Sequence, residues 1–455
     1  MRRRLLVVLV VLLAAAGCGG DDPVPLSGET LTVWNHEHQA DRLAATQAIL
    51  GDFTRTTGIK VEQLPIPEDS LPRMIRKAQA QGELPDVVLS TGMPHAHRYA
   101  AEGVFDPGAA EEVIDRLGRE TFSKRALALV SSQGRAVGVP SDGWGQLLIY
   151  RKDLFDKAGL HAPQTLSDVV AAAKELDGDG MAGIALATAP GDGFTHETFE
   201  HIALADGCQL VDAAADVTFD SPECVEALRV YAELARDYSV EGVQDVESTR
   251  AAYFSGQAAM LFWSPFLLDG LAGLSDETRP TCTQCKEDPA YLARNSGLVG
   301  PLAGSTGEPS QFGSVSTFNI SVDAPKEEAE RLVEYMLSDG YVRWLGLSPQ
   351  GKYPVRAGDA EDPERYAKAW GELESGIDRK APLTDFYSDA SIASLGEGVQ
   401  NFQRWGFAQG QGALVGKLAE KQPVANAVAE VIGGRDPAAA AKEVQAAVEE
   451  LKDGG

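Results

Sequence analysis

The sequence predicts an α/β fold of two lobes, in which the chain crosses between the lobes three times and ends in a helical region. Short apolar segments alternate with amphipathic helical segments, a pattern typical of a mostly parallel sheet covered by helices. Apolar strands that begin or end at loops near Ser141, Ala259 and Ser316 mark the three expected crossings. With 455 residues, of which 44% are apolar, the chain is long enough to fill more than one core.

Residues 1–17 have the composition of a secretion signal. Arg2 to Arg4 form a basic start, and the apolar core that follows is too short to stop in a bilayer. The segment ends in Ala15-Ala16-Gly17-Cys18, which resembles a lipobox, so we expect Cys18 to become a lipidated N-terminus. Residues 18–30 then form a tether to the cell membrane, and a plain signal peptide with an unrelated cysteine is the alternative.

The first lobe is predicted from an alternation of strands and helices. Strands are expected at residues 31–34, 59–62 and 85–90, and helices at 40–57 and 71–80. In such sheets ligands bind beyond the carboxyl ends of the strands. The loops that begin at Trp34 and at Ser90 therefore meet at one edge.

The second lobe follows the Gly- and Pro-rich loop at residues 138–145. Thr165 and Asp168 form a capping-box pattern for a helix over 166–176, and Ser221 with Pro222 starts another helix. An amphipathic helix is expected at 326–337, and further helices follow Pro363. We assign 31–140 and 260–316 to the first lobe, and 141–259 and 317–455 to the second.

The charge balance and the cysteines narrow the class of protein. A formal net charge of −27 disfavours nucleic acid and anionic lipid as partners, although solubility alone would explain it as well. Four cysteines follow Cys18, and an even count in an exported chain favours disulfides. We expect Cys208 to pair with Cys224, worth roughly 3 kcal/mol, and Cys282 to pair with Cys285 as a structural bridge rather than a redox pair.

Several of these segments, taken together and in order, resemble the sugar-binding, maltose-binding-protein-like family of extracellular solute-binding proteins that serve ABC importers. The matching motifs are Thr32-Val-Trp34, Gly58-Ile-Lys-Val61, Leu84-Pro-Asp-Val-Val88, Leu148-Ile-Tyr-Arg-Lys-Asp-Leu-Phe155, Val217-Thr-Phe-Asp-Ser-Pro-Glu223, Phe254-Ser-Gly-Gln-Ala-Ala-Met260 and Gly351-Lys-Tyr-Pro-Val-Arg356. The resemblance covers residues 31–355. It implies a periplasmic-binding-protein fold that binds a carbohydrate between its lobes and delivers it to a permease, as a monomer without a cofactor.

The candidate ligand contacts are aromatic rings, which stack on sugar rings, and polar groups, which bond to hydroxyls. They lie near the expected edge and crossings, with one ring in the C-terminal helices, and for each tryptophan packing in the core is the alternative. The candidates are Trp34, Asn35, His36, Glu37, Thr91, Asp142, Trp144, Asp192, Phe194, Trp263, Phe266 and Trp405.

Two other functions stay open. The loops that carry His36, His38, His95 and His97 favour a receptor for a transition-metal ion such as iron or zinc, since imidazole suits such ions. No adjacent pair of tyrosines, typical of ferric-ion-binding receptors, is found. A glycoside-processing enzyme using Glu37 and Asp142 is less favoured, because the sequence contains no motif of a hydrolase or phosphate-binding loop.

Overall fold

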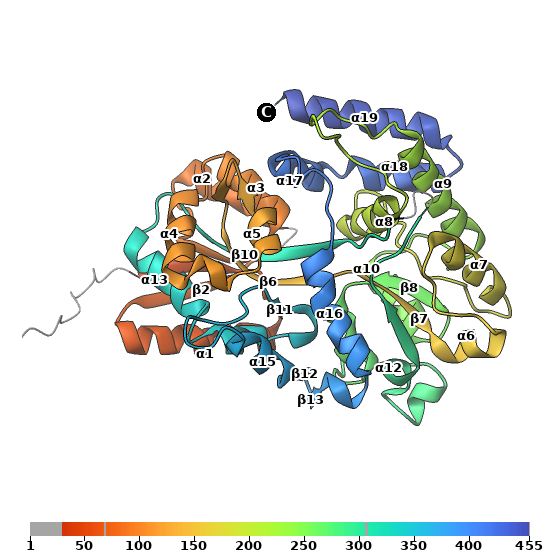
Figure 1. The fold of residues 1–455 in the computed structure, drawn as a ribbon, viewed down its shortest axis with the longest axis horizontal. Helices are drawn as coiled ribbons and strands as arrows, with labels where there is room; N and C mark the ends of the chain where they lie inside the picture. Colours follow the sequence, from red (N-terminus) through yellow and green to blue (C-terminus); the bar gives the residue numbers. More distant parts are fainter. Residues whose placement is uncertain (1–29, 68–69, 305–307, 455) are drawn as a thin grey trace, which may run out of the picture.

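The computed structural model describes residues 30–67, 70–304 and 308–454. The predicted signal peptide, Cys18 and all of the tether except residue 30 lie outside these residues. Figure 1 shows two lobes, the first with α1, α4 and α13 at the left and the second with α7 and α9 at the right. No helix of the described residues is long and apolar enough to cross a membrane.

The first lobe is built on a six-stranded sheet in the order β11-β6-β10-β3-β1-β2. Strand β1 is parallel to both of its neighbours, β2 and β3, whereas β10 is antiparallel to β3 and β6. Parallel pairing requires helical crossovers, and the predicted first helix occupies its expected bounds. The strands are β1 (Thr30–Asn35), β2 (Lys60–Pro65), β3 (Val87–Gly92), β6 (Val139–Gly145), β10 (Gly313–Ile320) and β11 (Tyr353–Pro354).

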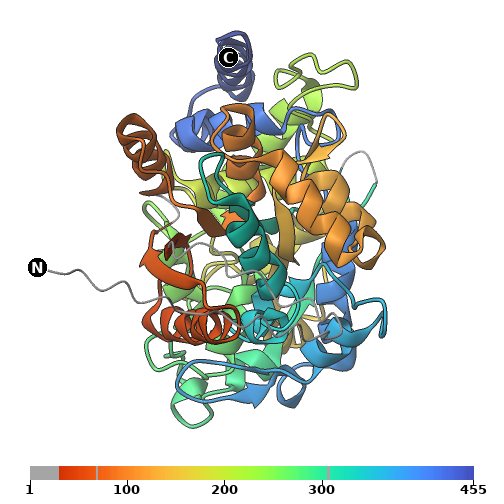
Figure 2. The ribbon, with the colours of Figure 1, turned by 90° about the vertical axis from the view of Figure 1, so that its left-hand side faces the viewer.

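Helices cover the first sheet, as Figure 2 shows from the side of this lobe. Most come from the first part of the chain, and the others follow β10 and β11. They are α1 (Ala40–Thr57), α2 (Leu71–Gln81), α3 (Met93–Ala101), α4 (Pro107–Leu117), α5 (Lys124–Leu129), α13 (Lys326–Met336), α14 (Tyr341–Leu345), α15 (Arg365–Gly371) and α16 (Asp389–Asn401). Two short ribbons, β4 (Ser131–Ser132) with β5 (Arg135–Ala136) and β12 (Glu374–Ser375) with β13 (Ala381–Pro382), complete the part before the last crossing.

The second lobe has a smaller, three-stranded antiparallel sheet in the order β8-β7-β9. Its strands are β7 (Leu147–Arg151), β8 (Met260–Trp263) and β9 (Ser296–Val299). Its helices are α6 (Lys152–Ala158), α7 (Leu166–Leu176), α8 (Gly193–Ala205), α9 (Pro222–Asp237), α10 (Val246–Phe254), α11 (Leu268–Leu271), α12 (Tyr291–Asn295), α18 (Pro423–Ile432) and α19 (Pro437–Asp453).

The sheet pairings correct two of the predicted crossings and shift the third. β8 pairs with β7, so the chain does not return to the first lobe near Ala259. Ser316 lies inside β10, a strand of the first sheet, and the crossing at Ser141 moves to Gln146, between β6 and β7. A short, fully buried apolar strand has no sequence signal for the sheet that it joins, which explains the misplacement of β8. The other crossings lie between β9 and β10 and after α16.

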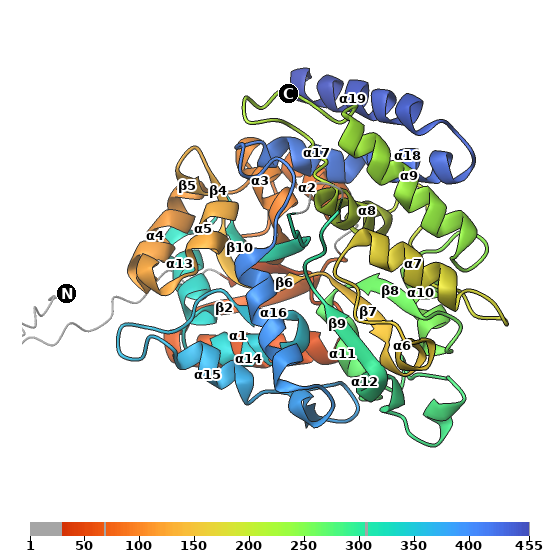
Figure 3. The same ribbon diagram turned by 45° about the vertical axis from the view of Figure 1, so that its right-hand side comes forward.

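Helix α17 (Gly412–Lys421) joins the two lobes at one side of the molecule. It packs on α3 of the first lobe and touches α19 of the second, and it lies between α3 and α18 in Figure 3. A methyl group on Gly416 would stand 2.4 Å from the carbonyl oxygen of Pro94, and one on Gly412 would stand 2.3 Å from Nδ1 of His97. The two glycines therefore let α17 approach α3 closely.

Local signals in the second lobe behave as the sequence predicts. The Thr165 side chain accepts the N–H of Asp168, whose carboxylate accepts the N–H of Thr165, so the capping box is confirmed. Ser221 caps α9. Both disulfides, Cys208–Cys224 and Cys282–Cys285, are present. The buried Cys282–Cys285 bridge lies against α10 and α11 in the core, in keeping with a structural bridge.

Candidate functional site: a cleft between the lobes

A cleft of about 770 Å³ lies where the two lobes face each other. Helices α2 and α3 form its first-lobe wall, and the start of α8 with the end of β8 forms its second-lobe wall. The crossing strands form the floor, and α17 closes one side. This volume lies within the range of small-molecule sites, which favour such positions between domains.

Aromatic rings gather on the second-lobe wall and the floor. Phe194 and Trp263 contact each other with ring centroids 4.7 Å apart, and both line the cleft. Trp144, on the floor, packs against Phe312 at 5.8 Å and stays half-buried. Trp144 stands next to the end of β6, and Trp263, at the end of β8, pairs with Leu147 at the start of β7, so both tryptophans lie beside the crossing at Gln146.

Polar groups stand beside these rings. Asp192 caps α8 by accepting the N–H of Thr195, and it lines the cleft next to Phe194. Gln146 lies at the crossing between β6 and β7; its side chain is 1% exposed and its Oε1 has no partner among the described residues. A buried amide oxygen without a partner is costly unless a ligand or water donates to it. Sequence reasoning missed Gln146, although its place between two predicted strands was a usable signal.

A buried ion pair supports the floor. The Arg404 guanidinium donates from Nε to Glu200 at 3.0 Å and lies over the ring of Phe312 at 4.2 Å. Burial alone would raise the pKa of Glu200, but Arg404 and the other donors around it lower that pKa. Arg404 lines the cleft, and Glu200 balances the charge of its guanidinium group.

The predicted polar contacts of the first lobe, Glu37 and Asp142, are engaged within the protein. Lys352 Nζ lies 2.6 Å from Glu37 Oε1 and 3.4 Å from Asp142 Oδ1, and all three side chains are at least nine-tenths buried. Arg42 also pairs with Glu37 at 2.9 Å. Burial would raise the pKa of Glu37, but the two cations lower it to about 2. Trp344 Nε1–H donates to Asp142 at 2.8 Å.

The structure also places other sequence candidates away from the cleft lining. Trp34 packs in a small core with Leu71 and Ile75, and Trp405 is fully buried in the second-lobe core, where its Nε1–H donates to the carbonyl of Cys208. These two placements follow the alternative of core packing. Of the remaining candidates, Asn35 bonds to Gln63, Thr91 is buried on β3, and Phe266 lies under Arg42 at 5.5 Å.

The four histidines of the metal alternative serve separate local roles. His36 and His38 each contact a backbone carbonyl through Nδ1, and His97 does so through Nε2. His95 lines the cleft. Burial lowers the pKa values of His36 and His95 to about 4, so both rings are neutral at pH 7. In the part of the chain that the structure describes, no three His, Cys, Asp or Glu residues are placed to hold a metal ion.

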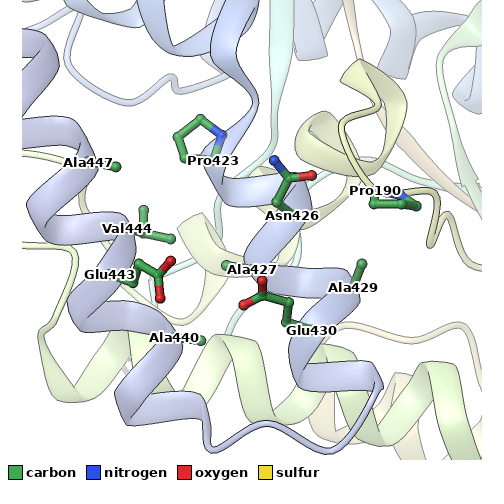
Figure 4. A pocket seen from close by; sticks show the side chains of 10 residues that line it. All are labelled: Pro190, Pro423, Asn426, Ala427, Ala429, Glu430, Ala440, Glu443, Val444 and Ala447. Carbon is green, nitrogen blue, oxygen red and sulfur yellow. The ribbon is translucent and has the colours of Figure 1, made fainter.

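A second hollow of about 450 Å³ lies between α18 and α19 (Figure 4). Its lining is mainly Ala and Pro, and its two carboxylates, Glu430 and Glu443, both pair with Arg435. It has no aromatic ring. The cleft between the lobes is therefore the better candidate site.

Two lobes around a polar and aromatic cleft define a protein that encloses a small molecule. The sequence profile of the bacterial extracellular solute-binding protein family matches residues 37–343, well over half of the chain. The chain belongs to this family, and the predicted resemblance is confirmed.

The chain is similar to one curated protein and to two solved structures over most of its length. The chain is 25% identical over 411 residues to the putative ABC transporter periplasmic-binding protein YcjN of Escherichia coli K12, a match that covers 88% of each protein. A solute-binding protein of Thermotoga lettingae with bound tagatose has a TM-score of 0.71 at 21% identity, covering 93% of this chain and 99% of that one. A sugar transporter protein of Arthrobacter chlorophenolicus with bound laminaribiose has a TM-score of 0.71 at 17% identity, with the same coverage. The two-lobe α/β prediction is confirmed.

Proposed function

We propose that this protein captures a carbohydrate in the cleft between its lobes and delivers it to the permease of an ABC transporter. The observation that carries the proposal is the set of three aromatic residues, Trp144, Phe194 and Trp263, that line one cleft beside polar groups. Aromatic faces stack on the C–H faces of sugar rings, and amides and carboxylates satisfy the hydroxyls. Sugars bound to the solved structures of similar fold support the same class of ligand.

Binding without catalysis is part of the proposal. A glycosidase pair needs two carboxyl groups that flank a glycosidic bond. Glu37 and Asp142 instead share the ammonium group of Lys352 inside the first lobe. Neither carboxylate lines the cleft, so neither is available to a substrate bound there.

The anchor and the location follow from the sequence. Cleavage before Cys18 and lipidation of that residue would hold the protein at the outer side of the cell membrane as a monomer. A globomycin-sensitive shift in mass, lost in Cys18→Ser, is the expected signature of this processing. If Cys18→Ser is bound to the membrane and has the same mass as the processed wild-type protein, lipidation of Cys18 is contradicted.

A panel of candidate ligands tests the function. The mature protein is titrated with maltose, laminaribiose, tagatose, glycerophosphocholine and zinc or ferric ions, and the melting temperature is recorded. At about a hundredfold excess over its dissociation constant, a true ligand adds about 2.7 kcal/mol to the free energy of unfolding. A response to a saccharide that is lost in Trp144→Ala supports the proposal. A response to a metal ion alone, reversed by a chelator, would replace it with the metal alternative.

A further inference from the structure

We propose that Glu420 is a specificity-determining residue of the cleft, whose ion pairs with Arg76 and Arg98 let the site accept a neutral saccharide and reject an anionic one. The inference rests on the proposed function for the kind of ligand. Its structural part, the masking of a cation by Glu420, can be tested without any saccharide.

Glu420 joins three elements. It lies near the end of α17 and lines the cleft, and its Oε1 is 2.7 Å from Nη1 of Arg76 on α2. Its Oε2 pairs with Nη1 of Arg98 on α3. One carboxylate therefore pairs with two guanidinium groups from two helices of the first-lobe wall, and Glu102 supplies a second carboxylate to Arg98.

The contacts of α17 with α3 and α19 fix the position of Glu420. The close approach of Gly412 and Gly416 sets α17 directly on α3, and Lys417 donates from Nζ to the carbonyl of Leu451 on α19. The Glu420 side chain is about one-fifth exposed. Burial would raise its pKa, but Arg98 and Arg76 lower it, so it is charged at neutral pH.

Glu420 contributes one of several charges to the cleft lining. The lining contains three guanidinium groups, from Arg73, Arg76 and Arg404, and three carboxylates, from Asp192, Glu197 and Glu420. His95 also lines the cleft and is neutral at pH 7. The lining is therefore formally neutral in a chain whose net charge is −27. Without the Glu420 charge, Arg76 would lose its ion pair at the cleft and Arg98 would keep Glu102. Guanidinium groups bind carboxylates and sulfates strongly because of their planar geometry.

The first experiment needs no saccharide. Glu420→Gln keeps the shape of the side chain and removes its charge, and sulfate is added in the millimolar range at constant ionic strength. We expect sulfate to raise the melting temperature of Glu420→Gln by several degrees and to leave the wild-type protein unchanged. Glu102→Gln is the matched control, because Glu102 pairs with Arg98 outside the cleft. Equal responses of the wild-type protein and Glu420→Gln would overturn the inference.

A double variant identifies the cation. Arg76→Gln in the Glu420→Gln background should abolish the response to sulfate, whereas Arg73→Gln in the same background should keep most of it. Arg73 lines the same wall but has no ion pair with Glu420. A response that survives Arg76→Gln would show that sulfate binds elsewhere, and the inference would fail.

The second experiment measures the selectivity of the cleft between a neutral and an anionic sugar. Calorimetry compares maltose with the same disaccharide carrying a carboxylate at its terminal C6. The wild-type protein should prefer the neutral sugar by more than tenfold, and Glu420→Gln should reduce that ratio at least tenfold. An unchanged ratio overturns the inference. If neither sugar binds the wild-type protein, the choice of saccharide in the proposed function fails, and the sulfate experiment still decides the role of Glu420.

Discussion

Both sheets carry candidate ligand contacts at one edge, but the structure uses them differently. At the edge of the first sheet, Glu37 and Asp142 are buried around Lys352 and hold the lobe together. At the edge of the second, Phe194 and Trp263 face the cleft. A carboxylate in a strand or just beyond its end is therefore not a ligand contact by default, since it can equally pair with a cation from the same lobe.

The source of that cation explains the difference. Lys352 comes from the turn before β11, more than 200 residues after Asp142, and its ammonium group lies 4.5 Å from the ring centroid of Trp344. In the second lobe, Trp263 and Phe194 pack against each other and line the cleft. The candidate carboxylates of the first lobe therefore stabilise that lobe, whereas the candidate rings of the second lobe remain available to a ligand.

The largest test of this comparison is the replacement Lys352→Met. It leaves two buried carboxylates without their shared cation, and we expect the free energy of unfolding to fall by about 3–5 kcal/mol. Urea denaturation measures the change. Saccharide affinity of the folded fraction should stay within about twofold, because Lys352 does not line the cleft.

Lys368→Met is the matched control for that loss. Lys368 also contacts two carboxylates, Asp362 and Glu364, but its side chain is 61% exposed. Exposed pairs contribute about 1 kcal/mol or less. An equal loss of stability in the two variants would mean that the Lys352 ion pairs contribute no more than exposed ones.

A second test uses pH at the first edge. Burial lowers the pKa of His36 from 6.5 to about 4, so the unfolded chain binds a proton between these values that the folded protein does not. Stability should therefore fall as the pH is lowered from 6.5 to 4, by up to about 1.4 kcal/mol per pH unit for each such histidine. His36→Gln should flatten this slope in denaturation curves.

Glu37 extends the loss to lower pH. Its folded-state pKa is depressed from 4.5 to about 2, so its contribution is present above pH 4.5 and disappears as the pH falls toward 2. Glu37→Gln should show a weaker pH dependence in that window. A slope that stays the same in both variants would contradict the buried arrangement at this edge.

A third test addresses the second edge and the floor beside it. Trp144→Ala and Trp263→Ala should each weaken saccharide binding by at least tenfold, about 1.4 kcal/mol, while the protein stays folded. Isothermal titration measures the affinity. Trp344→Phe is the contrasting control: it removes the N–H that Asp142 accepts, so it should lower stability and leave affinity unchanged. Unaltered affinity in both alanine variants would show that the ligand binds elsewhere.

Much of the fold could be predicted because its signals are local. The capping box at Thr165 and the Ser221-Pro222 helix start depend on neighbours within a few residues. The assignment of β8 to a sheet depends on pairing with β7, more than 100 residues earlier. Such pairing leaves no trace in four buried apolar residues.

The candidate site divides in the same way. Trp144 and Trp263 could be found because they flank apolar strands at the expected crossings or strand ends. Gln146, between two predicted strands, could have been found in the same way, whereas Glu420 could not be ranked, since its environment is set by the packing of α17 on α3. Trp405 shows the converse error: its Nε1–H finds a partner at Cys208 inside the core, which no spacing reveals.

The smallest effect on saccharide affinity is expected at Phe266, only three residues after Trp263. Phe266 follows Trp263 closely, but its ring lies over Gly351 and under Arg42 on the first-lobe side. Phe266→Leu should therefore change saccharide affinity by less than about twofold and cost a modest amount of stability, about 1 kcal/mol. Titration of Phe266→Leu beside Trp263→Ala makes the comparison directly. A tenfold loss in Phe266→Leu would place the ligand across both edges, and the division between a stabilising edge and a binding edge would be wrong.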